Sequence, residues 1–273
     1  MGFALVNKTI ASLRKEPSRE SELTDEDFYG MTVEILDEPI RDWYLVKTHY
    51  RYTGYVHSSE LLIDDARVKA WEKADKQVIL RSCADVLTMP KVQGIHMITL
   101  SRGAVISVLE KADQDGWVKA GLCDGRQGYI KEKSLGEYIT GWSLKDEKKL
   151  RRNIVNTALL YMGTQYRWGG RSPFGIDCSG LCSAAYMLNG VTIYRDAKIM
   201  EGFPIHEITY EQLKPCDLLF FPGHVAMCIG NCRYVHSTGK NGSDGVVINS
   251  LDPKAADYRE DLPSKLRAVG SIF

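Results

Sequence analysis

The chain has 273 residues, of which 44% are hydrophobic and 26% charged, as in folded globular proteins of two or three domains. Thirty-five basic residues balance 35 acidic residues, and this zero net charge argues against nucleic acid or a membrane surface as the main partner. No apolar run approaches the ~20 residues that cross a bilayer, and the first residues lack the apolar core and cleavage site of a signal peptide.

The cysteine content favours a reducing compartment. Seven cysteines are an odd number, and their spacing is not that of a disulfide framework. We therefore expect a cytoplasmic monomer with free thiols. An export leader that was removed from the chain stays open as an alternative.

Two segments of the N-terminal half repeat each other. The interval from Trp43 to Gly54 equals the interval from Trp117 to Gly128, and a Gly-Tyr-Val/Ile strand motif begins at each glycine. Short β-branched runs between turn residues predict the strands of a small barrel. Each repeat has about 60 residues, which suits an SH3-like barrel, and the repeat resembles bacterial SH3 domains.

The repeat sets the domain boundaries of the N-terminal half. We assign residues 1–63 to the first SH3-like barrel and 76–138 to the second, with the charged, helix-prone residues 64–75 as a linker. Such barrels bind peptides or cell-wall strands, so one interpretation is an accessory targeting role. In another, the tyrosine-rich tip of the first barrel forms part of an active-site wall, with Tyr52 and Glu22 as ligand contacts.

The C-terminal half begins with a predicted helix. Ser143 and Asp146 have the spacing of a capping box, and the helix ends before Gly163. Its apolar stripe comprises Leu150, Ile154, Ala158 and Tyr161.

Residues 166–190 are the most informative stretch. Glycines and a proline make the first part a loop that stops at Asp177. An apolar helical stripe follows and ends near Gly190, which places Cys178 at a helix N-terminus. The unpaired amides and the helix dipole should stabilise a thiolate there and lower the pKa of the thiol. This is the pattern of a cysteine nucleophile, whereas an isolated cysteine is more often an inert core residue.

Strands dominate the rest of the chain, and a helix pair followed by an antiparallel sheet predicts an α+β architecture. The predicted strands are Asp217–Phe221, His224–Ile229, Arg233–Ser237, Gly245–Ser250 and Leu266–Phe273.

Two histidines fall on neighbouring predicted strands. If residues 230–232 form the hairpin loop, Ile229 pairs with Arg233, and His224 and His236 become diagonal neighbours on one face. His224 would then take the thiol proton, and His236 would hold the other nitrogen of the His224 ring and fix its tautomer.

A zinc site is the alternative use of these side chains. The two histidines could be counted with Cys178, Cys182, Cys228 and Cys232 as ligands, but no Cys-x-x-Cys knuckle occurs. We expect no metal and no cofactor, with Cys182 and Cys228 as core thiols.

Several motifs together resemble the NlpC/P60 cysteine peptidases, which have a papain-like core. The matching segments are GTQYRWGG, DCSGLCSAAYMLNG, DLLFF, HVAMCIG and YVHSTG. The resemblance covers residues 144–273, and we assign 143–273 to this domain. The expected fold is therefore multidomain, with two SH3-like β-barrels followed by an α+β papain-like catalytic domain. Two SH3-like domains before such a core resemble the γ-D-glutamyl-L-diamino acid endopeptidases of murein peptide recycling.

The resemblance implies a role for each residue at a matching position. Cys178 would be the nucleophile, His224 the base and His236 the orienting residue, while Tyr166 would donate a hydrogen bond to the oxyanion. The residues implied to line the pocket for L-Ala-γ-D-Glu are Trp168, Asp177 and Ser179.

Asp177 has two interpretations. It could cap the helix, or its carboxylate could pair with the free ammonium of L-Ala, and one side chain could do both. The chain departs from the family pattern at Ala197 and Met200, where serine and glutamine are common, and at Cys216, where glycine is usual.

The implied function is hydrolysis of the bond between γ-D-Glu and a diamino acid in short murein peptides that have a free N-terminal L-Ala. One alternative is a hydrolase of intact peptidoglycan stem peptides that the SH3-like domains anchor. Another is a non-catalytic wall-binding module. The sequence leaves open whether the diamino acid is lysine or diaminopimelate.

Overall fold

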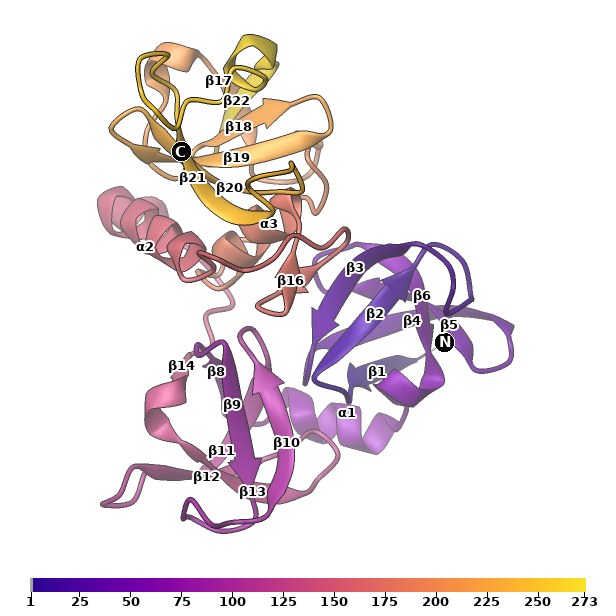
Figure 1. Ribbon diagram of the computed structural model, residues 1–273. Coiled ribbons are helices and arrows are strands. Elements are labelled where there is room, and N and C mark those ends of the chain that lie inside the picture. Colours follow the sequence, from indigo (N-terminus) through magenta and orange to yellow (C-terminus); the bar gives the residue numbers. More distant parts are fainter. Residues whose placement is uncertain (1) are drawn as a thin grey trace. The chain divides into compact units, whose positions relative to one another are not determined.

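The computed structural model describes residues 2–273 and divides them into two compact units. The first unit extends through Tyr138, and the second comprises Ile139–Phe273. In Figure 1 the first unit runs from indigo to pink and the second from pink to yellow.

The first unit consists of two seven-stranded antiparallel sheets. The first sheet contains β1 (Phe3–Val6), β2 (Ile10–Arg14), β3 (Leu23–Phe28), β4 (Thr32–Ile40), β5 (Trp43–Thr48), β6 (Thr53–His57) and β7 (Leu61–Leu62). The second contains β8 (Lys76–Ile79), β9 (Cys83–Leu87), β10 (His96–Ser101), β11 (Val105–Glu110), β12 (Trp117–Gly121), β13 (Gln127–Lys131) and β14 (Leu135–Glu137). The spatial orders, β3-β2-β6-β5-β4-β1-β7 and β10-β9-β13-β12-β11-β8-β14, correspond strand for strand. This correspondence confirms the predicted repeat of SH3-like barrels.

The repeated glycine of each barrel marks a close approach between strands. A Cβ atom at Gly54 would lie 2.9 Å from the Cβ of Leu13, and one at Gly128 would lie 2.6 Å from a methyl carbon of Val86. Any larger side chain would push the neighbouring strand away. The glycine therefore recurs at the same point of both barrels.

The segment predicted as a linker is packed against its neighbours. It contains α1 (Asp65–Glu72), where Trp71 is only 5% exposed and donates its indole N–H to the Gly30 carbonyl at 2.8 Å. The two barrels also touch directly, because the amide of Cys123 donates to the Tyr29 hydroxyl at 2.9 Å. The barrels and α1 thus share one compact unit.

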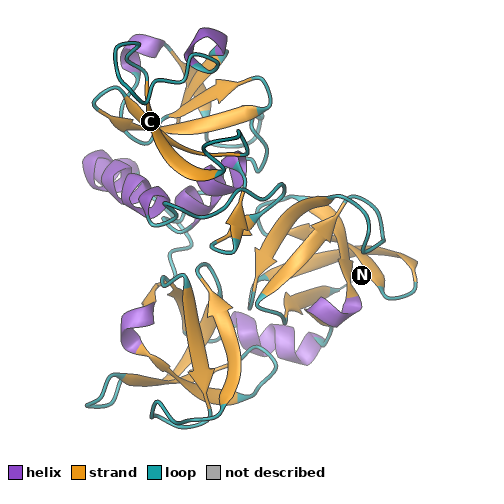
Figure 2. Cartoon of the chain, in the orientation of Figure 1, coloured by secondary structure: helices purple, strands orange, loops and turns teal. Residues whose placement is uncertain are grey.

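The second unit has the expected α+β architecture, with α2 and α3 packed against its sheet (Figure 2). The helices are α2 (Glu147–Leu159) and α3 (Cys178–Met187), and a small ribbon pairs β15 (Arg171–Ser172) with β16 (Gly175–Ile176). The sheet order is β17 (His206–Ile208), β22 (Ala268–Ser271), β18 (Leu218–Phe221), β19 (His224–Gly230), β20 (Arg233–Thr238) and β21 (Gly245–Ser250). The edge strand β17 was not predicted.

Alternate residues of the sheet divide between two hydrophobic clusters, as the period of two in a strand requires. Val225 and Met227 of β19 belong to the larger cluster with the apolar residues of α2 and α3. Ala226 belongs to a smaller cluster with Tyr234 and Phe221. One cluster therefore fixes the helices against the sheet, and the other packs beside the histidines described below.

The predicted capping box is wrong. The Ser143 hydroxyl accepts from the amide of Lys145 and caps the short 3-10 turn Leu144–Asp146. The Asp146 carboxylate accepts from the amide of Lys149 and caps α2. Ser143 and Asp146 therefore cap two successive elements and do not bond to each other's backbone as in a capping box. The 3-10 turn is wound more tightly than an α-helix, so α2 begins only after it.

The predicted hairpin is also wrong at its turn. Gly230, rather than Ile229, pairs with Arg233, and the turn contains only Asn231 and Cys232, with φ angles of 52° and 55°. Positive φ at both central residues is the tight turn that suits a twisted hairpin. A bulge at Ile229 then restores the predicted register further along β19 and β20.

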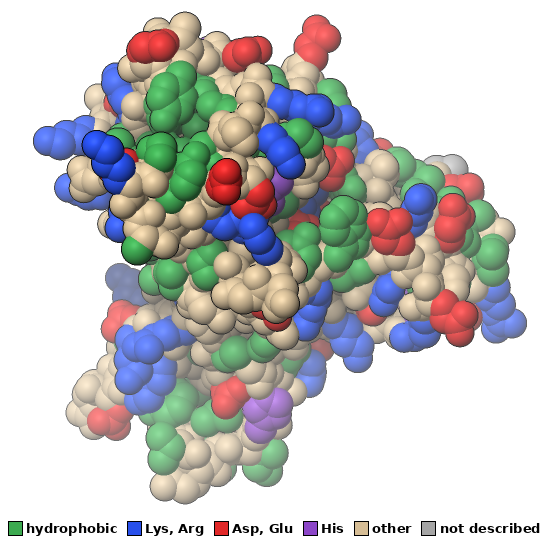
Figure 3. All heavy atoms as spheres, turned by 45° about the horizontal axis from the view of Figure 1, so that its top comes forward, with side chains coloured by type: hydrophobic (Ala, Val, Ile, Leu, Met, Phe, Trp, Pro, Cys, Tyr) green, Lys and Arg blue, Asp and Glu red, His purple; other side chains and the backbone are tan. Residues whose placement is uncertain are grey.

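The surface carries both signs of charge on each unit, as expected for 35 basic and 35 acidic residues (Figure 3). Across residues 2–273, no helix is both long and apolar enough to cross a membrane.

Candidate active site

Cys178 occupies the first position of α3, as its sequence context predicts. The preceding Asp177 caps the helix by accepting from the amide of Gly180 at 2.6 Å. Cys178 is only 6% exposed and packs in one hydrophobic cluster with Val225, and the backbone amides of Val225 and Ser179 act on its thiol. Because Val225 follows His224 directly, the sulfur lies beside the strand that carries the predicted base.

The predicted shift of the thiol pKa is wrong in direction. Burial, with a smaller contribution from the carboxylate of Asp177, raises the pKa of Cys178 to about 11. The two amides act in the predicted sense and lower the pKa, but they do not outweigh burial. Near neutral pH Cys178 is therefore a neutral thiol, which must lose its proton before it can act as a nucleophile.

The two histidines form the predicted pair. Nε2 of His224 lies 2.7 Å from Nδ1 of His236, and His236 is completely buried. Burial lowers the pKa of His224 to about 3 and that of His236 to about 4. Both rings are therefore neutral at physiological pH, and a neutral imidazole can accept a proton from a neutral thiol.

Tyr166 lies close enough to the thiol for the two groups to interact electrostatically. Burial raises the pKa of Tyr166 to about 12, and Cys178 and Asp177 add to the shift. The phenol therefore keeps its proton near neutral pH and can donate a hydrogen bond to developing negative charge. This property suits the oxyanion role that the family resemblance implies for Tyr166.

Arg195 is a functional candidate that the sequence did not reveal. It is 2% exposed, and its guanidinium donates to both carboxylate oxygens of Asp177, at 3.1 and 3.0 Å, and to the Ser179 hydroxyl at 2.8 Å. It lies in the irregular segment between α3 and β17. An arginine in a loop gives no periodic signal, so only the fold brings it to the start of α3.

The ion pair with Arg195 bears on both interpretations of Asp177. Its carboxylate already accepts from Arg195, Gly180, Ser179 and the amide of Gly169. The negative charge is therefore compensated inside the protein, and an incoming ammonium would not meet an unpaired carboxylate. The structure supports the helix-capping interpretation of Asp177.

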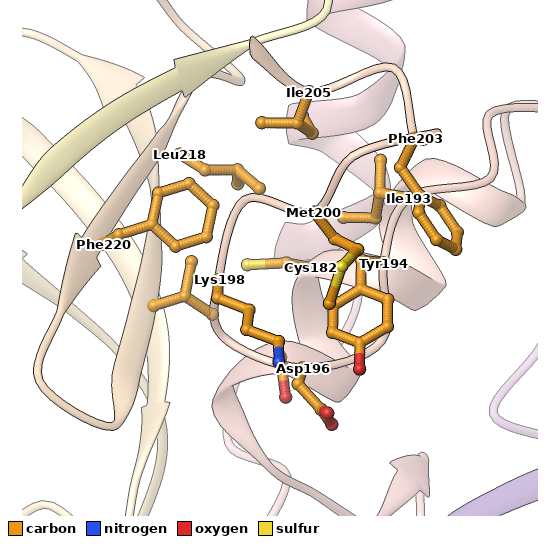
Figure 4. A pocket seen from close by; sticks show the side chains of 12 residues that line it. Cys182, Ile193, Tyr194, Asp196, Lys198, Met200, Phe203, Ile205, Leu218 and Phe220 are labelled. Atoms are coloured by element: carbon orange, nitrogen blue, oxygen red, sulfur yellow. The ribbon is translucent and has the colours of Figure 1, made fainter. Parts of the chain in front are cut away.

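A pocket lies next to Cys178 and opens among the side chains in Figure 4. Ser179 and Val225, the chain neighbours of Cys178 and His224, contribute to its wall. The other lining residues are Cys182, Ile193, Tyr194, Asp196, Lys198, Met200, Phe203, Ile205, Leu218 and Phe220. The cavity measures about 10 Å³, no more than one water needs, so flexible side chains such as Met200 must move to admit a ligand.

Four further predicted contacts have different outcomes. Ser179 lines the pocket, whereas the indole of Trp168 is 62% exposed and does not belong to the lining residues. Tyr52 and Glu22 belong to the first unit, where Tyr52 is half-buried and Glu22 pairs with Lys15 at 3.5 Å. Their predicted contact with a ligand stays a prediction.

The cysteines are all free thiols, and Cys182 and Cys228 are buried, as expected for core residues. Within residues 2–273, no three His, Cys, Asp or Glu side chains are grouped as metal ligands.

Comparison with known proteins assigns the chain to a family. Residues 163–259 match the NlpC/P60 family, residues 11–61 the bacterial SH3 domain, and residues 81–138 the variant SH3 domain. Dipeptidyl-peptidase 6 of Lysinibacillus sphaericus is 46% identical over 99% of both chains. The chain belongs to the NlpC/P60 family. As an NlpC/P60 member it is a cysteine peptidase with SH3-like domains.

Other similar proteins agree with this assignment. The γ-D-glutamyl-L-lysine dipeptidyl-peptidase of Bacillus subtilis is 34% identical over 42% of this chain and 43% of that protein. The crystal structure of an NlpC/P60 family protein from Bacillus cereus matches 98% of both chains with a TM-score of 0.80 at 18% identity, which shows the shared fold.

Proposed function

We propose that this NlpC/P60 peptidase hydrolyses the γ-D-glutamyl-L-diamino acid bond of short murein peptides that have a free N-terminal L-Ala. The observation that carries the proposal is the buried Cys178 at the start of α3, beside the strand of the hydrogen-bonded histidine pair. The names of the two relatives above, both dipeptidyl-peptidases, support the substrate class.

The geometry supports a two-step mechanism through a thioester. His224 takes the thiol proton as Cys178 attacks the γ-carbonyl of D-Glu, and His236 holds the His224 ring in place. The oxyanion accepts hydrogen bonds from the Tyr166 hydroxyl and the Cys178 amide. His224 then protonates the leaving amine, and water hydrolyses the thioester.

The charges of the pocket match those of the proposed substrate. Asp196 and Lys198 contribute one acidic and one basic side chain to the lining (Figure 4). L-Ala-γ-D-Glu likewise carries one ammonium and one α-carboxylate near the scissile bond. We propose that Asp196, rather than Asp177, attracts the ammonium, because the charge of Asp177 is already compensated by Arg195.

The deciding experiment compares free L-Ala-γ-D-Glu-L-Lys with the same peptide acetylated at its amine. We expect acetylation to lower kcat/KM by at least about 100-fold, because it leaves a desolvated carboxylate unpaired. Asp196→Asn should reduce the difference in kcat/KM between the free and the acetylated peptide. Asp252→Asn, at an exposed turn of the same unit, should leave that difference unchanged. Equal rates on both peptides would reject the proposal and favour a hydrolase of intact stem peptides. Replacing lysine by diaminopimelate in the free peptide defines the preferred diamino acid.

The seven free thiols support a cytoplasmic site of action, which belongs to the same proposal.

A further inference from the structure

The histidine pair is continued by a third side chain. Nε2 of His236 lies 2.9 Å from Oδ1 of Asn249, a half-buried residue of β21. Asn249 pairs with Tyr234 across the two strands, so it is a diagonal neighbour of His236 on the same face. A chain of hydrogen bonds therefore runs from His224 through His236 to Asn249.

The amide orientation of Asn249 is fixed by its other contact. Its Nδ2 donates to the backbone carbonyl of Asp257 at 2.6 Å. That carbonyl is held in place, because it also accepts from the Ser250 amide and the Asp257 carboxylate pairs with Arg233. Rotating the amide by 180° would place two carbonyl oxygens together, so Oδ1 must face His236.

The orientation of this amide determines where the protons lie on both rings. An amide oxygen only accepts, so Nε2 of His236 must carry the proton and Nδ1 must be the acceptor. Nε2 of His224 must then donate to that Nδ1, which leaves Nδ1 of His224 unprotonated. The opposite arrangement would set the unprotonated Nε2 of His236 against the oxygen of Asn249.

We propose that Asn249 is a positioning residue that holds both histidines in the Nε2–H tautomer and leaves Nδ1 of His224 as the proton acceptor. The proposal rests on the proposed role of His224 as the base. It goes beyond the Cys178, His224 and His236 set, because Asn249 acts two side chains away from the sulfur.

The test measures ring tautomers directly in the full chain with ¹⁵N-labelled histidine. Nitrogen chemical shifts and long-range proton couplings at pH 7.5 distinguish Nε2–H from Nδ1–H without any substrate. We expect Nε2–H on both His224 and His236 in the wild-type protein. In Asn249→Ala we expect a mixture of tautomers on both rings.

The matching kinetic measurement uses the peptide substrate. Asn249→Ala should lower kcat by about 10- to 100-fold with little change in KM, as for other residues that orient a histidine from behind. Asn189→Ala is the matched control, because it removes another buried amide of the same unit that bonds to Ala185 and Thr157. It should keep both tautomers and kcat while lowering stability.

Asn249→Asp supplies a second variant that keeps an acceptor oxygen towards His236. It should retain the Nε2–H tautomers and recover part of the kcat that the alanine variant loses, while lowering stability because its second oxygen faces the Asp257 carbonyl. Nδ1–H on either ring of the wild-type protein, or an Asn249→Ala protein with unchanged tautomers and kcat, would overturn the inference. If the wild-type protein does not cut the peptide, the proposed function fails, while the tautomer measurement still decides the role of Asn249.

Discussion

The two sides of the candidate active site differ in the charge that they carry. The helix side consists of Asp177, Cys178 and Ser179 of the α3 start together with Arg195, and it contains a buried ion pair at 3.0 Å. The sheet side consists of His224, His236 and Asn249, which are linked by single hydrogen bonds. Charge is fixed on the helix side, whereas the sheet side is neutral.

In the proposed mechanism the two sides have different roles. The helix side holds the site in place, and the sheet side takes up and releases the proton. The Asp177 carboxylate is bound by several donors, so it holds the loop, the helix start and Arg195 in one arrangement. The neutral rings can gain a proton during the reaction and lose it again. We therefore expect the ion pair of the helix side to keep the site in one geometry while the protonation state of the histidine rings changes.

The largest expected effect comes from removing the sulfur. Cys178→Ala should abolish hydrolysis of the peptide, a loss of up to about 10⁶-fold in kcat, because no other group can form the thioester. Cys228→Ala is the control, since it removes an equally buried thiol from the same unit. Steady-state kinetics together with circular dichroism separate chemistry from folding. Retained activity in Cys178→Ala would disprove the assignment of the nucleophile.

Breaking the ion pair of the helix side should affect both stability and activity. Arg195→Met leaves the Asp177 carboxylate buried without its counterion, which should lower the free energy of unfolding by about 3–5 kcal/mol. Arg151→Met is the matched variant, because Arg151 pairs at 2.7 Å with the fully buried Asp217 elsewhere in the unit.

Urea unfolding and peptide kinetics distinguish these two arginine variants. Both should lose similar stability, but only Arg195→Met should lose kcat/KM under conditions where both proteins remain folded. An equal loss of kcat/KM in the two variants would mean that Arg195 acts through stability alone.

Removing the phenolic hydroxyl tests the oxyanion site between the two sides. Tyr166→Phe should lower kcat by about 100-fold, because one hydrogen bond to the oxyanion is lost. Tyr186→Phe removes a buried hydroxyl that donates to the Cys216 carbonyl at 2.7 Å, and it should lower stability without changing kcat. A Tyr166→Phe enzyme with wild-type kcat would exclude the hydroxyl from the oxyanion site.

The neutral rings should make the protein less stable in acid. The unfolded chain binds protons near the ordinary histidine pKa of 6.5, but folded His236 binds one only near pH 4. The stability contributed by the neutral ring is therefore present above pH 6.5 and is lost as the pH falls towards 4. At pH 5 the loss should be on the order of 2 kcal/mol for this ring.

The measurement is urea unfolding of the wild-type protein and His236→Gln at pH 7 and pH 5. The wild-type protein should lose more stability between these pH values than the variant, because other titrating groups are common to both. An equal loss would show that His236 is not buried as a neutral ring.

Local sequence patterns predicted the parts of the site that lie close together in the chain. Asp177 and Cys178 were predictable because a glycine-rich loop followed by an apolar stripe marks a helix start. The pairing of His224 with His236 was predictable from strand register, even though the turn residues were assigned wrongly. The barrel repeat was predictable because the same glycine is required at Gly54 and Gly128.

The parts that were missed depend on contacts between distant segments. Arg195 lies in an irregular loop and reaches Asp177 only through the fold. Asn249 lies within a predicted strand, and the strand pattern gives no reason to distinguish its amide from the other polar side chains of the strands. The raised pKa of Cys178 depends on how deeply the helix start is buried, and its sequence context shows only the opposing effect of the dipole.

The most direct test is the pH dependence of Cys178 alkylation by iodoacetamide in the wild-type protein and in His224→Ala, followed by peptide mass mapping. In the wild-type protein we expect a rate that is nearly constant between pH 5 and pH 9, because neutral His224 removes the proton from the neutral thiol. In His224→Ala the rate should rise about tenfold per pH unit, because only the small thiolate fraction reacts. The same pH dependence in both proteins would contradict proton transfer from Cys178 to His224.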